Sequence, residues 1–135
     1  MKKKSHTIKE KIIQVEDIIS DDLKKRYTPQ QLAKMVNMDV DTLHAQFRKE
    51  NGRSIRSFQS EARIVAGRIL IAFTEKSIRS IANEVGFSSS SSFSQQFKKI
   101  VGVAPGVFRK KTKEEEKALN ASPNKKRRYL SNPRP

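Results

Sequence analysis

Residues 81–102 read IANEVGFSSSSSFSQQFKKIVG, with five consecutive serines in the middle of an apolar pattern. A serine run alone is typical of a flexible linker, because serine is only a middling helix former. Here, however, Phe93 and Phe97 lie one helical turn apart, and Gly102 follows where a helix would end. The stretch therefore predicts a short helix, a tight turn and a second helix that begins within the serines.

The same pattern occurs earlier in the chain, where residues 32–52 read LAKMVNMDVDTLHAQFRKENG. Eight positions match at an offset of 49 residues before the turn and 50 after it. The matched positions are Leu32/Ile81, Ala33/Ala82, Val36/Val85, Leu43/Phe93, Phe47/Phe97, Arg48/Lys98, Lys49/Lys99 and Gly52/Gly102. Each copy is predicted to be a helix-turn-helix unit, and the second turn is one residue longer than the first.

Helical periodicity extends over the rest of residues 8–110, and no segment has the alternation of a half-buried strand. We therefore expect an all-α fold in which one long helix, from Ser54 to Phe73, joins the two units. Helix starts are predicted at Thr28, which is followed by Pro29 and Gln31, and at Asp39, Ser54 and Ser77. A short turn is predicted from Pro105 to Phe108. The inward stripes are predicted to be Ile8, Ile12, Val15, Ile19 and Leu23, and Ile55, Phe58, Ala62, Ala66, Ile69, Leu70 and Phe73.

The chain has 135 residues and a formal net charge of +15, which favours a polyanionic partner such as DNA, RNA or an anionic membrane. It contains no cysteine, so a disulfide framework and a thiolate metal site are excluded. No apolar run approaches the ~20 residues that span a bilayer, and the basic start lacks the apolar segment of a signal peptide. We expect residues 1–7 to be flexible, and residues 111–135 to form a disordered basic tail with a short helix near residues 113–119.

Helical geometry predicts what the two units do. Positions 91 and 95 lie about 200° from Phe93 around a helix, so Ser91 and Gln95 face outward. A helix-turn-helix unit places its second helix in the major groove of DNA. A linker helix of about 20 residues spans ~30 Å, close to the ~34 Å at which groove segments recur on one side of DNA. One chain is therefore expected to read two adjacent groove segments as a monomer, with direct-repeat or asymmetric half-sites.

These residues resemble a known family. The segments ARIVAGRIL (62–70), SIRSIANEVGFSSSSSFSQQFKK (77–99) and GVAPGVFR (102–109) are similar to the DNA-binding domain of AraC/XylS transcription regulators. The resemblance covers about residues 10–109. It implies seven helices, two helix-turn-helix units on a linker helix, and control of transcription in the bacterial cytoplasm at the nucleoid. The chain looks like the short, single-domain members of the family.

The resemblance also implies DNA-contacting residues, at the positions of this chain that match the family's motifs. The base-facing residues that it implies are Asp41, His44, Ala45, Ser90, Ser91, Ser92 and Gln95. The phosphate contacts that it implies are Arg48, Lys49, Ser77, Lys98 and Lys99. Arg63 matches a frequent linker-helix arginine and is expected to be structural.

Two positions depart from the family's usual long polar, basic or aromatic side chains. Asp41 is repelled by phosphates unless it accepts a hydrogen bond from a cytosine amino group, and Ala45 offers only an apolar contact, for example to a thymine methyl. The first unit is therefore expected to contribute only a weak base preference. Gln95 is the side chain of the second unit suited to a bidentate adenine contact.

Three function classes remain open. The first is a sequence-specific regulator of transcription, an activator that also contacts RNA polymerase. The second is an architectural DNA-binding protein, for example of a mobile element, and the third is a module whose basic face docks an acidic protein. No catalytic triad, phosphate loop or zinc spacing is present in the sequence, so an enzyme, a cofactor and a metal are not expected. His44 is either a groove contact or an exposed bystander.

Overall fold

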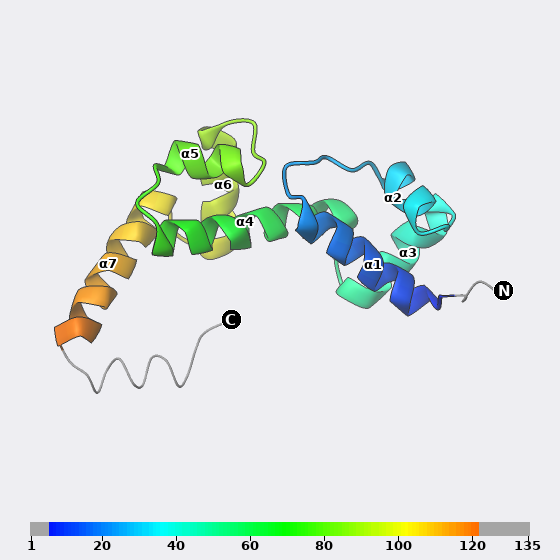
Figure 1. Ribbon diagram of the computed structural model, residues 1–135, viewed down its shortest axis with the longest axis horizontal. Helices are drawn as coiled ribbons and strands as arrows, with labels where there is room; N and C mark the ends of the chain where they lie inside the picture. Colours follow the sequence, from blue (N-terminus) through cyan, green and yellow to red (C-terminus); the bar gives the residue numbers. More distant parts are fainter. Residues whose placement is uncertain (1–5, 122–135) are drawn as a thin grey trace.

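The computed structural model describes residues 6–121, and within this range the chain forms helices and no strand (Figure 1). The helices are α1 (Ile8–Asp21), α2 (Pro29–Met35), α3 (Val40–Asn51), α4 (Ile55–Phe73), α5 (Ile78–Glu84), α6 (Ser90–Val101) and α7 (Pro105–Ala121). The predicted all-α architecture is therefore confirmed, with α2–α3 and α5–α6 as the two helix-turn-helix units and α4 between them.

The sequence repeat is also a structural repeat. Thr28 caps α2 and Ser77 caps α5, and the predicted capping box between Thr28 and Gln31 is formed. The two second helices end in the same way, because Gly52 and Gly102 take left-handed conformations with φ of 72° and 100°. In both units, a capping residue thus fixes the start of the first helix and a glycine fixes the end of the second helix.

The turns inside the two units are also equivalent. In the first turn, Met38 N donates to Ala33 O at 2.8 Å, and in the second Phe87 N donates to Ala82 O at 2.9 Å. These bonds close the C-terminal ends of α2 and α5 before the chain enters the next helix. The second turn contains the extra residue that the sequence offset predicted.

The molecule has two hydrophobic cores, one for each unit. The first consists of Ile12, Val15, Ile19, Leu32, Ala33, Val36, Leu43, Phe47 and Ile55, so α1 closes it against α2 and α3. The second consists of Ile64, Ile71, Ile81, Ala82, Val85, Phe93 and Phe97. The two cores share no residue, and α4 runs from one to the other (Figure 1).

The single apolar stripe predicted along α4 is right in part, since Ile55, Phe58, Ala66 and Leu70 pack against a core. It fails towards the end of the helix, because α4 uses different faces at its two ends. Ile55 belongs to the first core and Ile64 to the second. At about 100° per residue, these two positions lie on opposite sides of the helix. The predicted inward residues Ile69 and Phe73 are consequently 54% and 83% exposed, as is Val65 at 57%.

The ends of the described range also differ from expectation. Thr7 is not part of a flexible start, because its hydroxyl accepts from Glu10 N at 3.1 Å and caps α1. At the other end, α7 runs unbroken to Ala121, so the helix expected near residues 113–119 is present but the turn ending at Phe108 and the disordered tail from residue 111 are not. Residues 1–5 and 122–135, which include the basic run at 125–128, lie outside the described range.

The inward stripe of α1 is shorter than predicted. Ile12, Val15 and Ile19 are buried as expected, but Ile8 is 46% exposed. Leu23 lies beyond the end of the helix, in the loop that leads to α2.

Candidate nucleic-acid interface

Helix α3 presents the outward side chains that the sequence predicted for the first unit. Leu43 and Phe47 are fully buried and fix the rotation of the helix about its axis. On the opposite side, Asp41, His44, Ala45 and Arg48 fall within an arc of about 100°, and these four residues and Lys49 are all exposed. The five predicted residues of α3 thus share one solvent-facing surface.

Helix α6 is oriented in the same way, because Phe93 and Phe97 occupy the positions equivalent to Leu43 and Phe47 and are likewise fully buried. Ser91, Gln95, Lys98 and Lys99 are exposed. They repeat the positions of Asp41, Ala45, Arg48 and Lys49 fifty residues earlier. The structure therefore gives the two helices equivalent outward faces with different side chains.

The serine run starts α6 and is not a linker. Ser89 is the N-cap, and its Oγ accepts from Ser92 N at 3.0 Å. The same hydroxyl donates to Ser92 Oγ at 3.1 Å. Ser91 is exposed near the centre of the outward face, and Ser92 is half-buried at its edge. Ser90 was also predicted to face bases, but it is half-buried on the side of the helix that carries Phe93 and Phe97.

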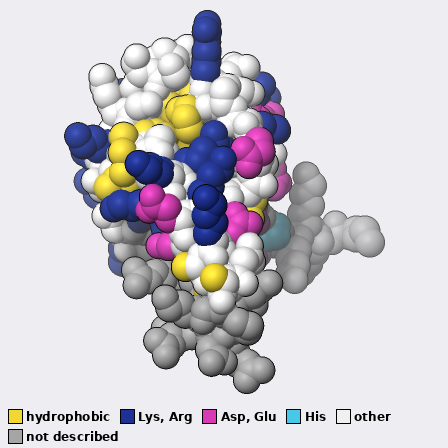
Figure 2. Space-filling view, turned by 90° about the vertical axis from the view of Figure 1, so that its left-hand side faces the viewer, with side chains coloured by type: hydrophobic (Ala, Val, Ile, Leu, Met, Phe, Trp, Pro, Cys, Tyr) yellow, Lys and Arg dark blue, Asp and Glu magenta, His cyan; other side chains and the backbone are white. Residues whose placement is uncertain are grey.

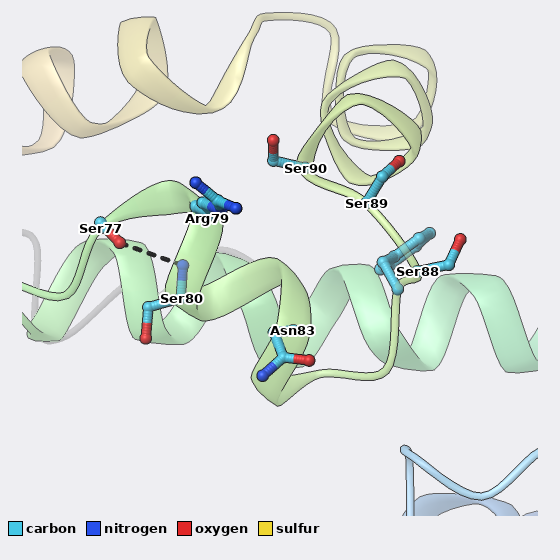
Figure 3. Close-up of a pocket in the computed structure, with 8 residues that line it drawn as sticks. Ser77, Arg79, Ser80, Asn83, Ser88, Ser89 and Ser90 are labelled. Atoms are coloured by element: carbon cyan, nitrogen blue, oxygen red, sulfur yellow. Dashed lines mark hydrogen bonds between the residues drawn. The ribbon is translucent and has the colours of Figure 1, made fainter.

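An open groove of about 690 Å³ lies between α5 and the start of α6 (Figure 3). Its polar lining comes from serines of both segments and from Arg79 and Asn83 on α5. Sequence reasoning missed these two residues, because no motif marks them. Their place on the first helix of the second unit, beside the turn, was the available signal. Ser77 also lines the groove, and its hydroxyl accepts from Ser80 N at 3.0 Å.

Basic side chains mark the ends of both outward faces. Arg48 and Lys49 lie in the last turn of α3, and Lys98 and Lys99 lie in the last turn of α6. Positive charge there interacts favourably with the negative end of the helix dipole. Among residues 6–121, the ion pairs join other groups: His6–Glu10, Arg53–Glu61, Lys76–Glu84 and Lys113–Glu75. The four basic residues thus keep their charge available to a polyanion.

The end of the molecule formed by α5, α6 and α7 carries further basic groups, interspersed with carboxylates (Figure 2). Within the described range, no cluster of three or more His, Asp or Glu residues is placed to hold a metal ion. Over the same range, no helix is both long enough and apolar enough to cross a membrane.

The two outward faces belong to helices that pack against different parts of the scaffold. Helix α3 packs against α1, and α6 packs against α4. In Figure 1, α3 passes behind α1 and α6 passes behind α4. With 19 residues, α4 spans about 28 Å at ~1.5 Å per residue.

A family model described as a helix-turn-helix domain matches residues 32–111, which include most of the first unit, the linker helix and the second unit. The chain belongs to the AraC/XylS family. The Msm operon regulatory protein of Streptococcus mutans is 34% identical over 97 residues, or 72% of this chain and 35% of that protein. The transcriptional activator RhaR of Klebsiella pneumoniae is 34% identical over 71 residues, or 53% of this chain and 25% of RhaR. The chain thus spans about a third or less of these relatives.

Solved AraC-type domains share the fold. A regulator from Chromobacterium violaceum aligns with a TM-score of 0.73 at 22% identity, covering 77% of this chain and 93% of that one. The DNA-binding domain of AdpA, solved with a target DNA, aligns with a TM-score of 0.68 at 19% identity, covering 83% and 96%. The AraC/XylS domain predicted from the sequence is therefore confirmed in both family and fold.

Proposed function

We propose that this chain is a sequence-specific DNA-binding regulator that places α3 and α6 in two successive major-groove segments of one duplex. The observation that carries the proposal is that α3 and α6, in units joined by α4, bury equivalent side chains and present equivalent outward faces. The ~28 Å length of α4 is somewhat shorter than the ~34 Å repeat of the groove. Binding of both helices is therefore expected to bend the duplex towards the protein.

The two helices divide the recognition unequally. In α6, exposed Gln95 makes a bidentate contact with adenine in this proposal, and Ser91 adds a small hydrogen-bonding group beside it. In α3, Asp41 accepts from a cytosine amino group, Ala45 contacts a thymine methyl, and His44 completes the face. Ser92 contributes at the edge of the second site, and Ser90 contributes from the groove beside α5. Sequence preference is thus expected to be sharper at the α6 half-site.

The basic residues supply affinity that does not depend on sequence. Arg48, Lys49, Lys98 and Lys99 meet phosphates and release counterions from them. Arg79 extends this phosphate contact on the α5 side of α6, next to Ser77 and Ser90. These contacts set the register of the recognition helices on the duplex.

The regulatory proposal rests on the names of relatives. RhaR is described as a transcriptional activator, and the Msm protein as an operon regulator. We extend activation to this chain, with contact to RNA polymerase and action as a monomer at the nucleoid in the cytoplasm. The second candidate, an architectural protein without promoter control, is favoured only by the weakly reading Asp41 and Ala45.

Selection from random duplexes followed by titration tests the proposal. The wild-type chain is used to select a target from a random 30-base-pair library, and binding is measured on the target and on its single-base variants. Gln95→Ala is expected to relax preference at one position and leave the other positions unchanged. Lys99→Ala is expected to weaken binding to all sequences alike and to reduce the salt slope by about 1.

Lys113→Ala is the matched control for Lys99→Ala. Lys113 lies on α7 rather than on a recognition helix, and it pairs with Glu75 at 3.1 Å. Lys113→Ala is expected to alter the salt slope less than Lys99→Ala does. Equal losses on every sequence for Gln95→Ala and Lys99→Ala would contradict base reading by α6. Selection of no sequence pattern, despite tight binding, would favour the architectural candidate.

A further inference from the structure

The loop between α1 and α2 crosses from the first unit and touches the turn of the second. Figure 1 places this loop beside the turn that joins α5 to α6, and a hydrogen bond links the two: Arg26 Nη2 donates to Gly86 O at 3.3 Å. Since the two hydrophobic cores share no residue, this is a direct contact between the units that bypasses their cores.

Two side chains of α4 hold the loop at its two ends. Arg63 Nε donates to Leu23 O at 2.9 Å, and Gln59 Nε2 donates to Tyr27 O at 3.3 Å. Gln59 and Arg63 are four residues apart, so they project from the same side of α4. The loop is therefore fastened to the linker helix at two backbone carbonyls and reaches the second unit between them.

Gly86 fits the loop so closely that no side chain can stand there. A Cβ on Gly86 would lie 2.6 Å from Leu23 O and 3.1 Å from the Cα of Lys24. The equivalent residue of the first unit is Asn37, which also has a positive φ, of 55°. Asparagine tolerates this left-handed conformation. The φ of 101° at Gly86 already disfavours a side chain, and the close approach of the loop excludes one at position 86.

Arg63 is the centre of this arrangement. It is only 8% exposed, and none of the ion pairs within residues 6–121 involves it. Burial, and secondly the nearby charge of Arg26, lower the pKa of Arg63 from its ordinary value. A buried cation is costly unless it makes hydrogen bonds, so the Leu23 carbonyl is a strong attachment point for the loop.

We propose that loop 22–27, Arg63 and Gly86 form a clamp between the units that fixes the distance and angle between α3 and α6. The clamp converts two separately folded units into one rigid ruler, and it thereby determines which half-site spacing the chain accepts. The link to half-site spacing rests on the proposed function, whereas the rigidity itself does not.

The rigidity can be measured without DNA. The chain contains no cysteine, so spin labels can be placed at two sites alone. Lys34→Cys on α2 and Asn83→Cys on α5 are exposed, equivalent positions of the two units. Double electron–electron resonance then reports the distribution of distances between the units. Three clamp variants are compared with the parent: Arg63→Met, Arg26→Ala and Gly86→Asn.

We expect one narrow distance distribution in the parent, and a shifted or at least twofold broader distribution in the clamp variants. Lys24→Ala removes the same charge as Arg26→Ala from the same loop, and its side chain makes no hydrogen bond of the clamp, so it is expected to match the parent. Arg26 is exposed, so Arg26→Ala folds even if Arg63→Met does not. Unchanged distributions in Arg26→Ala and Gly86→Asn would overturn the clamp.

Binding to DNA tests the second half of the proposal. The duplex selected by the wild-type chain is compared with versions that carry one or two inserted base pairs between the half-sites, and with each half-site alone. We expect a loss of about tenfold per insertion for the parent, because a rigid chain cannot engage both sites at the wrong spacing. In Arg26→Ala and Gly86→Asn this loss should fall to about threefold, with half-site binding within twofold of the parent.

The possible failures are distinct. A spacing penalty that stays at the parental value would refute the ruler, and equal losses on half-sites and on the full site would assign these residues to local DNA contact. If the wild-type chain selects no duplex, the proposed function fails, while the distance measurement still decides whether the clamp exists.

Discussion

Gly67 offers the sharpest test of how the linker helix meets the second unit. It lies within α4, where alanine normally stabilises a helix by about 1 kcal/mol relative to glycine. Here, however, a Cβ would lie 2.7 Å and 2.8 Å from the Cε1 and Cζ atoms of Phe93. The gain in helix propensity is therefore opposed by a clash with the side chain that anchors the recognition helix α6.

The Phe93 ring is enclosed by other side chains. It is fully buried and has Phe87 and Phe97 as neighbours, at ring-centroid distances of 5.4 Å and 5.6 Å. Overpacking of this kind costs about 1–3 kcal/mol. Since the ring is enclosed, we expect the cost to exceed the gain, so that Gly67→Ala lowers the free energy of unfolding by about 1–2 kcal/mol.

Urea unfolding followed by circular dichroism measures this change, with the m-value expected to stay constant. Gly106→Ala is the matched control, since Gly106 lies in helix α7 and a Cβ there meets no atom within 4 Å. It is expected to be neutral or to stabilise by up to ~1 kcal/mol. In a Phe93→Leu background, Gly67→Ala should cost less. Stabilisation by Gly67→Ala equal to that by Gly106→Ala would refute the packing argument.

Three further changes test single elements. Thr28→Ala removes the hydroxyl of the α2 capping box and should cost about 1 kcal/mol in the same urea assay; no change would mean that the cap is not formed. Arg109→Met removes hydrogen bonds to the carbonyls of Ile71 and Thr74 at the end of α4, each of 3.3 Å, and should cost about 1.5–3 kcal/mol; a loss below 0.5 kcal/mol would contradict that role. The hydrogen bond with His6 lowers the pKa of Glu10, so this contact should stabilise α1 at pH values above the unfolded-state pKa of Glu10 and be lost as the pH falls through its folded-state pKa. NMR titration should show that His6→Ala returns the Glu10 pKa towards its ordinary value. An unchanged Glu10 pKa would exclude the contact.

Helix ends and the repeat could be predicted from the sequence because both depend on local chemistry. Thr28 with Gln31 forms a capping box, and Asp39 accepts from nearby backbone amides, without help from the rest of the fold. Gly52 and Gly102 end their helices for the same local reason. Once the caps were placed, the rotation of α3 and α6 followed from two buried side chains in each helix.

The buried residues of the linker helix α4 could not be predicted from one apolar stripe, because they are decided by packing partners far away in the sequence. Ile69 and Phe73 have the right period but lie beyond the cover of the first unit and on the wrong side for the second. Arg63 donates a hydrogen bond to the carbonyl of Leu23, 40 residues earlier, and Gly67 packs against Phe93, 26 residues later. A single apolar stripe is expected only for a helix that packs against one core, whereas α4 contributes side chains to two cores.

The last helix was predicted too short for a different reason. Residues 110–117 are almost all charged, which favours disorder when composition alone is considered. Lysine and glutamate are nevertheless good helix formers, and Lys113 pairs with Glu75 across to the end of α4. The helix propensity of these lysines and glutamates, together with the ion pair between Lys113 and Glu75, therefore favours the extension of α7 beyond Phe108.

Hydroxyl-radical footprinting of the wild-type chain on its selected duplex tests the central claim most directly. Two recognition helices on one scaffold predict two protected patches on the same side of the duplex, with centres about 10 base pairs apart. Gln95→Ala should weaken the patch at the α6 half-site more than the other. A single patch covering one groove segment, or uniform protection along the duplex, would contradict the account.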